Sequence, residues 1–94
     1  SWDKVREYLN RSDLSKDIKK KQIYWKDYDG LTTFSVACFM KGPKDIIKSM
    51  IAIAGDEIVH LATDLNCTPL HAACYQGVDV DVGIMKLLVQ TGKK

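Results

Sequence analysis

Cysteine and histidine side chains gather near residue 70, and these are the side-chain types that bind zinc. Cys67 is followed by His71 after three intervening residues, and Cys74 follows after two more. Structural zinc is almost always held by four ligands. A fourth ligand is missing from this segment unless His60 folds over it. We therefore predict no metal site and no cofactor.

The same side chains are the main candidates for catalysis. His60, His71 and the three cysteines are the conventional bases and nucleophiles, apart from hydroxyls and carboxylates. The sequence contains neither a glycine-rich phosphate loop nor a nucleophile elbow. Cys67 is the thiol that we expect to be exposed, but no cationic neighbour in the sequence would activate it. These features predict a non-catalytic protein without a small-molecule substrate.

Lysines cluster near the N-terminal end, where they could contact an anionic partner. The Lys16–Lys21 segment contains four lysines, and residues 1–26 carry 8 basic and 4 acidic side chains against 6 and 8 in residues 27–94. Clustered basic groups bind phosphate through counterion release. The formal net charge is only +2, and the interleaved aromatic residues of a single-strand binder are missing. A solvated helix face is the preferred interpretation, with phospholipid or nucleic-acid contact as an alternative.

Length and composition predict one small globular domain. The chain has 94 residues, of which 46% are hydrophobic and 28% charged. No apolar run approaches the roughly 18 residues of a membrane span, and the first residues do not resemble a signal peptide. Three cysteines, two of them in alanine-rich apolar strings, indicate reduced thiols. We expect a cytoplasmic or nuclear protein, and a chain that is part of a larger one.

The chain contains an internal repeat. Gly30–Cys38 aligns with Asn66–Cys74, and Thr, Ala and Cys each recur at a separation of 36 (68 − 32, 73 − 37 and 74 − 38). Farther along, Ile46–Ile51 aligns with Ile84–Val89 at a separation of 38 (84 − 46). A period in this range is typical of stacked repeat architectures.

Each unit predicts two helices. In the second unit Thr68 suits the N-cap and Pro69 the first helical position. Small residues such as Ala73 would allow a neighbouring helix to approach closely. The second helix of each unit has apolar residues at helical spacing, and we expect it to end at Gly55 or Gly92 in the left-handed conformation.

Two segments do not fit this pattern. Residues 56–66 are too irregular for a helix and too polar for a buried strand, so they predict a projecting hairpin or an extended loop. Residues 11–24 predict a long inserted connection, in which Asp13 or Ser15 caps a short helix that ends at Lys21.

The segment Thr68-Pro69-Leu70-His71-Ala72-Ala73 resembles the Thr-Pro-Leu-His-x-Ala-Ala signature of the ankyrin repeat. The first unit is similar but diverged, since Ser35 replaces the histidine and Lys41-Gly42 places the glycine one residue late. The resemblance implies that the imidazole of His71 bonds backbone and a threonine hydroxyl, which Ser35 could reproduce only in part.

The resemblance also implies the architecture. The expected fold is all-α, an ankyrin-repeat solenoid of stacked helix-turn-helix pairs with projecting hairpin loops. We expect a single domain over residues 1–94, with a partial repeat helix at 1–10, an inserted basic connection at 11–24, and repeats at 25–62 and 63–94.

The function implied by the resemblance is protein–protein interaction, through the hairpin tips and the concave surface of the inner helices. Large apolar side chains follow the Ala-Cys pair of each unit, and such residues often dominate interface energetics. An alternative is that Phe39 and Met40 pack under the Tyr24–Trp25 segment. The predicted partner-binding residues are Tyr28, Asp29, Leu31, Phe39, Met40, Asp64, Leu65, Cys67, Tyr75 and Gln76.

An alternative to protein binding is that the repeats serve as a structural cap or spacer between domains.

A further expectation concerns self-association. The last predicted helix carries Ile84, Met85, Leu87 and Leu88, which would normally pack on a following repeat. We therefore expect an adhesive C-terminal face that allows self-association.

Overall fold

The computed structural model describes residues 1–75 and 81–93, and their fold is all-α. The β-structure of this part of the chain is limited to an isolated bridge between Lys26 and Thr32. No helix in the described residues is long and apolar enough to cross a membrane. The elements are α1 (Trp2–Leu9), α2 (Lys16–Tyr24), α3 (Thr33–Phe39), α4 (Lys44–Ala54), the 3-10 helix η1 (Asp56–His60), α5 (Pro69–Cys74) and α6 (Val82–Gly92).

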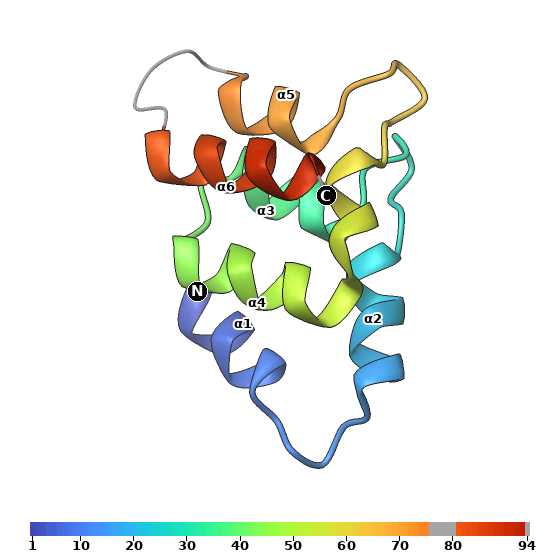
Figure 1. Cartoon of the computed structure of the whole chain (residues 1–94). Coiled ribbons are helices and arrows are strands. Elements are labelled where there is room, and N and C mark those ends of the chain that lie inside the picture. The colour runs from blue at the N-terminus through green and yellow to red at the C-terminus, as the bar shows by residue number, and fades with distance from the viewer. Residues whose placement is uncertain (76–80, 94) are drawn as a thin grey trace.

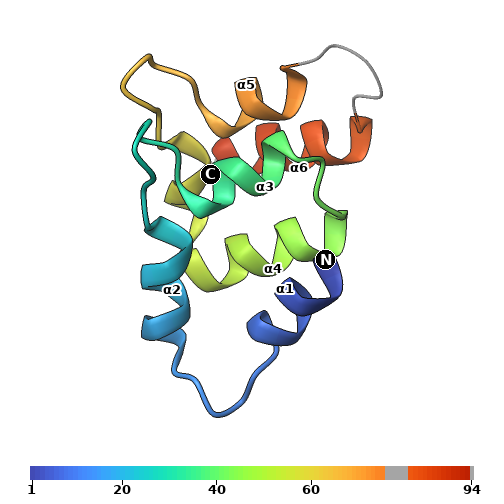
Figure 2. The same cartoon turned by 180° about the vertical axis from the view of Figure 1, so that it is seen from behind.

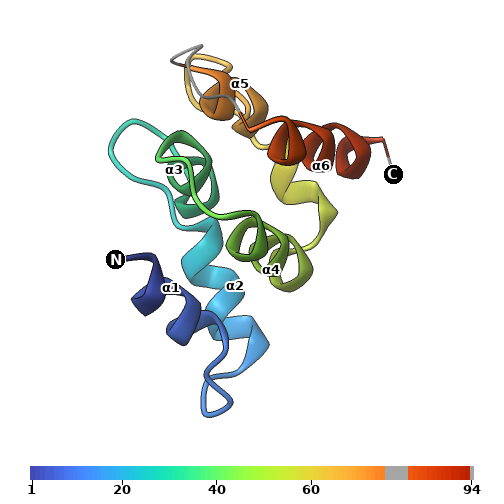
Figure 3. The same ribbon diagram turned by 90° about the vertical axis from the view of Figure 1, so that its left-hand side faces the viewer.

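The helices form layers. Helices α3 and α4 run in opposite directions, and α5 and α6 form a similar pair above them (Figure 1). Seen from the side, α3 and α5 lie together in one layer and α4 and α6 in the other (Figure 3). Helices α1 and α2 pack against α4 on the side away from α6 (Figures 1 and 2).

The turns that precede α3 and α5 share one pattern of hydrogen bonds. The amide of Asp27 donates to the carbonyl of Leu31 at 2.9 Å, and the amide of Thr63 donates to that of Cys67 at 3.0 Å. These residues are 36 positions apart (63 − 27 and 67 − 31). The fourth residue of each turn has a positive φ, 83° at Gly30 and 62° at Asn66. Glycine and asparagine are the residues that adopt this conformation most readily.

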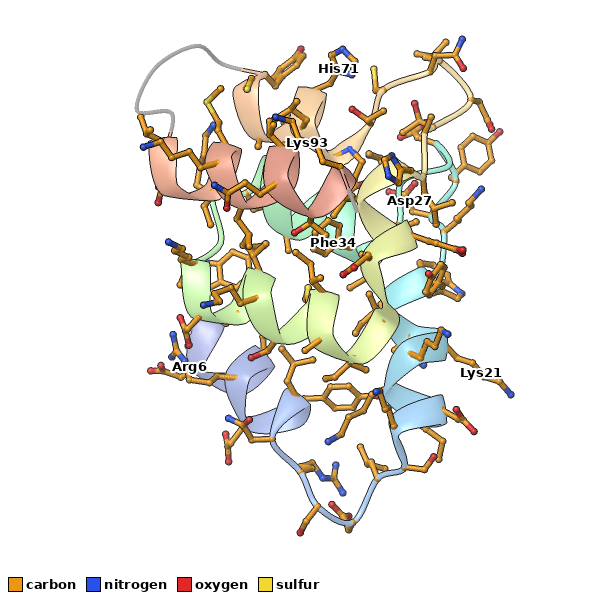
Figure 4. All side chains as sticks on the ribbon, viewed as in Figure 1. Arg6, Lys21, Asp27, Phe34, His71 and Lys93 are labelled. Atoms are coloured by element: carbon orange, nitrogen blue, oxygen red, sulfur yellow. The ribbon has the colours of Figure 1, made fainter. Side chains whose placement is uncertain are left out.

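The core lies between the layers. Phe34, Ile46 and Ile47 are almost completely buried, and Phe34 points into the interior (Figure 4). Burying such a side chain stabilises a fold by about 1.5–3 kcal/mol. The short helices α3 and α5 bury small residues, among them Ala37 and Ala73, so their backbones can lie close together.

Helix α2 is longer than the sequence predicts. Of the two candidate caps, Ser15 is used, because its hydroxyl accepts from the amide of Ile18 at 3.2 Å. The helix continues past Lys21 to Tyr24 because Ile23 is buried and the Tyr24 hydroxyl donates to the carbonyl of Ala54. The segment is therefore part of the packed structure.

Other local predictions also need correction. Residues 56–60 form a 3-10 helix instead of a loop, since Ile58 and Val59 are buried and anchor the turn. Helix α4 ends before Gly55, whose φ of 95° is positive as expected, but its ψ of 161° is extended and not the left-handed helical value. Helix α6 ends at Gly92 as predicted, but Gly92 belongs to the helix, and an added Cβ there would be 3.3 Å from the ring of His60.

The end of α3 departs from the expected glycine turn. Lys41 itself takes the left-handed conformation, with a φ of 62°, and its Nζ donates to the carbonyl of Ala73 in α5. Gly42 lies between the carbonyl of Ala37 and the ring of Trp2, each 3.1 Å from where a Cβ would stand. Gly42 therefore allows the Trp2 ring and the Ala37 carbonyl to pack closely against the backbone. In the second unit the sequence predicts a break between the helices at Gln76-Gly77, and this segment lies outside the described residues.

The outer face of α6 also differs from expectation. Ile84 and Leu88 are buried within this chain, and Met85 and Leu87 are half-buried. The exposed apolar side chains of the helix are Val82 (60%) and Val89 (41%). The apolar surface that α6 offers to a neighbour is therefore smaller than the residue pattern suggests.

The N-terminal helix is tied to the rest by polar contacts. The guanidinium of Arg6 donates to both carboxylate oxygens of Asp45, at 2.7 and 3.2 Å. The Nζ of Lys19 is buried and donates to the carbonyl of Leu9, the last residue of α1, at 2.9 Å. A cation at a helix C-terminus is favourable because it satisfies an otherwise unpaired carbonyl.

We predict that Ala73→Leu lowers the free energy of unfolding by about 1–3 kcal/mol, because the larger side chain overpacks the buried site. Ala52 is exposed on α4, so Ala52→Leu is a matched control, expected to stay within about 0.5 kcal/mol. Urea unfolding followed by circular dichroism measures both changes. Equal stability of the two variants would contradict the packing described for α5.

We also predict an acid-dependent contribution from the link between α1 and α4. The hydrogen bond from Arg6, helped by its charge, lowers the pKa of Asp45 below its ordinary value of 3.8. The unfolded state therefore binds a proton at higher pH than the folded state, so the stabilisation is present above about pH 3.8 and is lost as pH falls through the folded pKa.

Carboxyl titration by NMR tests this link. In the Arg6→Gln variant the pKa of Asp45 should rise toward 3.8, whereas that of Asp13, which is lowered by its own hydrogen bond with Arg11, should stay low. An unchanged Asp45 titration in the variant would show that the pair does not form in solution.

Candidate functional site

An apolar groove lies where α3 and α5 meet the two turns that precede them. Its volume is about 210 Å³. Side chains from both repeated units line it, so it exists only because the units are packed together. The lining residues are Asp29, Leu31, Phe39, Thr63, Leu65, Cys67, His71, Ala72 and Tyr75.

The turns are held in shape by one side chain each. A carboxylate oxygen of Asp27 accepts from the amides of Asp29 (2.9 Å) and Leu31 (3.0 Å). The hydroxyl of Thr63 accepts from the amides of Leu65 and Cys67, both at 3.2 Å. Such side-chain-to-backbone bonds fix a turn without help from a sheet. They hold in place the turn residues that line the groove.

The helices contribute an aromatic pair. The rings of Phe39 in α3 and Tyr75 after α5 have centroids 5.3 Å apart and are tilted by 52°. This tilted arrangement is favourable for two aromatic rings. Phe39 remains 36% exposed and Tyr75 72% exposed, so both keep apolar surface available to a ligand.

His71 caps the helix from which it projects. Its Nδ1 accepts from the amide of Thr68 at 3.2 Å and lies 3.0 Å from the Thr68 hydroxyl. Since Nδ1 accepts the amide proton, the neutral ring carries its own proton on Nε2. Thr32 and Ser35 form the corresponding cap of α3, where the Ser35 amide donates to the Thr32 hydroxyl at 3.0 Å. The role expected for His71 as a structural residue agrees with these bonds, and Figure 4 shows its ring at the outer end of α5.

Most predicted partner-binding residues lie at this groove. Six of them line it, namely Asp29, Leu31, Phe39, Leu65, Cys67 and Tyr75. Tyr28 is fully exposed at the tip of its turn, Met40 is 60% exposed beyond the end of α3, and Asp64 is exposed in the second turn. Gln76 lies outside the described residues.

The alternative placement of Phe39 and Met40 under the Tyr24–Trp25 segment is wrong. The carbonyl of Trp25 accepts from the amide of Thr33, at the first turn of α3, whereas Phe39 is the last residue of that helix. Trp25 itself is 61% exposed. The segment is therefore held at the opposite end of α3 and leaves Phe39 and Met40 uncovered.

The groove also contains three residues that the sequence does not mark as binding residues, Thr63, His71 and Ala72. Thr63 was placed in the irregular connection, although it lies 36 residues after Asp27 (63 − 27), which occupies the same position in the first turn. Extending the repeat register upstream would have found it. Ala72 is buried, yet it still lines the groove.

The three cysteines have different surroundings. Cys38 is buried, and this burial raises the pKa of its thiol to about 12. Cys67 is exposed and lines the groove, whereas Cys74 is half-buried. In the described residues, no three His, Cys, Asp or Glu side chains are grouped in a way that could hold a metal ion.

The lysine-rich segment does not present its charges together. Lys19 is buried against α1, while Lys20 and Lys21 line a separate open hollow with Asp17, Glu57 and Tyr24. Lys20 lies over the ring of Tyr24, with its Nζ 5.8 Å from the centroid. Carboxylates beside the exposed ammonium groups weaken the field that an anionic partner would meet.

Comparisons of the chain with protein-family models, with curated proteins and with solved structures find no match.

We predict that thiol alkylation of the folded protein proceeds in a fixed order. Iodoacetamide at pH 8 should modify Cys67 first and leave Cys38 unmodified, because burial keeps that thiol protonated and out of reach. Mass spectrometry of proteolytic peptides gives the extent of alkylation at each cysteine. In 8 M urea all three should react at similar rates. Labelling of Cys38 as fast as Cys67 without urea would contradict the buried position.

Proposed function

We propose that the chain is a non-catalytic protein-binding module of the ankyrin-repeat type, and that it binds another protein in the groove between the two turns and the α3–α5 layer. The observation that carries this proposal is the groove itself, an apolar surface built jointly by equivalent residues of two sequence repeats.

Repeated geometry supports the fold assignment. The two turns share their hydrogen bonds, their positive-φ residue and the side-chain acceptor at their first position. Helices α3 and α5 begin 36 residues apart (69 − 33), and α4 and α6 begin 38 apart (82 − 44). Matching elements at nearly equal spacings, stacked in matching layers, are what a repeat solenoid requires.

The position and chemistry of the groove support protein binding. Its large apolar side chains are Leu31, Phe39, Leu65 and Tyr75, and Leu65 is 85% exposed. Exposed apolar side chains gathered in one concavity mark interaction sites more often than scattered ones do. Aromatic residues in such a position frequently dominate the binding energy.

The alternative of a purely structural cap or spacer makes a different prediction. A spacer does not need apolar side chains in a solvent-filled groove. A spacer would keep its function after any polar substitution of Leu65 or Tyr75 that preserves the fold. The same substitutions separate this alternative from the binding proposal.

The test uses the triple variant Phe39→Ala/Leu65→Ala/Tyr75→Ala. Proteins captured by the immobilised chain are identified by quantitative mass spectrometry, and the dissociation constant of the purified leading partner is then measured. Loss of three apolar contacts should weaken the binding of that partner by about 100-fold or more, because each anchor residue contributes more than about 1 kcal/mol to the binding free energy.

A matched control removes apolar surface elsewhere. Ile18→Ala/Val82→Ala/Val89→Ala takes away exposed aliphatic side chains of α2 and α6 and should leave binding unchanged. Thermal unfolding of both variants confirms that each is folded. A partner that binds the folded groove variant as tightly as the unaltered chain would overturn the proposed binding surface.

A further inference from the structure

One end of the groove carries negative charge. Asp29 is a lining residue, and the described part of the lining contains neither lysine nor arginine. Asp64 belongs to the neighbouring turn, and its carboxylate Oδ1 is 3.2 Å from where a Cβ on Gly30 would stand. Since Gly30 directly follows Asp29, the carboxylates of the two turns flank the same end of the groove.

These two carboxylates are available to a ligand. Both residues are exposed. The ion pairs formed among the described residues involve Asp3, Asp13 and Asp45 instead. Asp27, the other acidic residue of the first turn, is already occupied, because its carboxylate accepts the amides of Asp29 and Leu31.

The opposite end of the groove is apolar and aromatic. Phe39 and Tyr75 meet at the C-terminal ends of α3 and α5, whereas the two turns precede these helices, and Leu31, Leu65 and Ala72 complete the apolar lining. A ligand that fills this surface must therefore place an apolar side chain on the floor. Its binding is stronger if it also places a positive charge near the carboxylates of the turns, whereas a negative charge there would be repelled.

We propose that the groove takes a short peptide segment of another protein in which an aromatic or aliphatic side chain lies within a few residues of a lysine or arginine, on either side of it. This inference rests on the proposed function and adds the chemistry of the partner. Arginine has an additional contact available, because Tyr28 directly precedes Asp29 in the chain, and its fully exposed ring can accept a cation on its face.

The experiment selects peptides from a random 12-residue phage-displayed library against the whole chain, and then measures synthetic copies by fluorescence polarisation. Enriched peptides should pair an apolar residue with lysine or arginine. Replacing that cation by glutamine should weaken binding to the unaltered chain by about 3- to 10-fold in 50 mM NaCl, and by less in 500 mM NaCl, where screening is stronger.

The variant Asp29→Asn/Asp64→Asn assigns the effect to the groove. With this variant the lysine or arginine and the glutamine peptides should bind equally. Glu7→Gln/Asp17→Asn removes the same amount of charge from exposed positions on α1 and α2 and should keep the preference for the cationic peptide. Protection of Cys67 from iodoacetamide by saturating peptide reports occupancy of the groove directly.

The outcomes separate the two proposals. Enriched peptides that protect Cys67 but show no preference for a cation, or prefer an acid, overturn this inference and leave groove binding intact. Peptides that fail to protect Cys67 and tolerate Phe39→Ala/Leu65→Ala/Tyr75→Ala overturn the groove as the binding surface. Absence of any enriched peptide overturns the inference as well.

Discussion

Helices α3 and α5 lie side by side, and small residues are what they bury there: Ala37 and Cys38 in one helix, Ala72 and Ala73 in the other. Larger side chains at these positions would separate the helices. The turns before both helices would then move apart, and the groove that they share would open. Close approach between the two short helices is therefore the condition on which the shape of the candidate site depends.

The remaining elements support this contact from outside. Helices α4 and α6 form the second layer and supply most of the branched apolar side chains, among them Ile46, Ile47 and Ile84. Helices α1 and α2 cover the far side of α4, where polar contacts from Arg6 and Lys19 fix their positions. The hydrophobic effect thus supplies most of the stability, whereas hydrogen bonds to particular carbonyls and carboxylates determine how the helices are arranged.

The sequence predicted those parts of the fold that follow from local rules. The Thr-Pro pair at 68–69 marked the start of α5, and apolar residues at helical spacing marked α4 and α6. It predicted poorly where a tertiary contact overrides local preference. Helix α2 is longer than predicted because Ile23 is buried. The segment expected to be a loop forms η1 because Ile58 and Val59 are buried. Lys41 adopts a positive φ, a conformation that glycine usually adopts. Six groove residues followed from the resemblance to the ankyrin repeat, but the groove itself depends on how two turns pack, which no single segment specifies.

The bond from Lys41 to the carbonyl of Ala73 has a consequence for how the molecule melts. It joins the end of α3 to α5 across the boundary between the two units, and the Phe39–Tyr75 pair crosses the same boundary. Both contacts are lost as soon as the segment on either side of this boundary unfolds. The groove is lined by residues from both sides of the boundary, so unfolding of either side removes it.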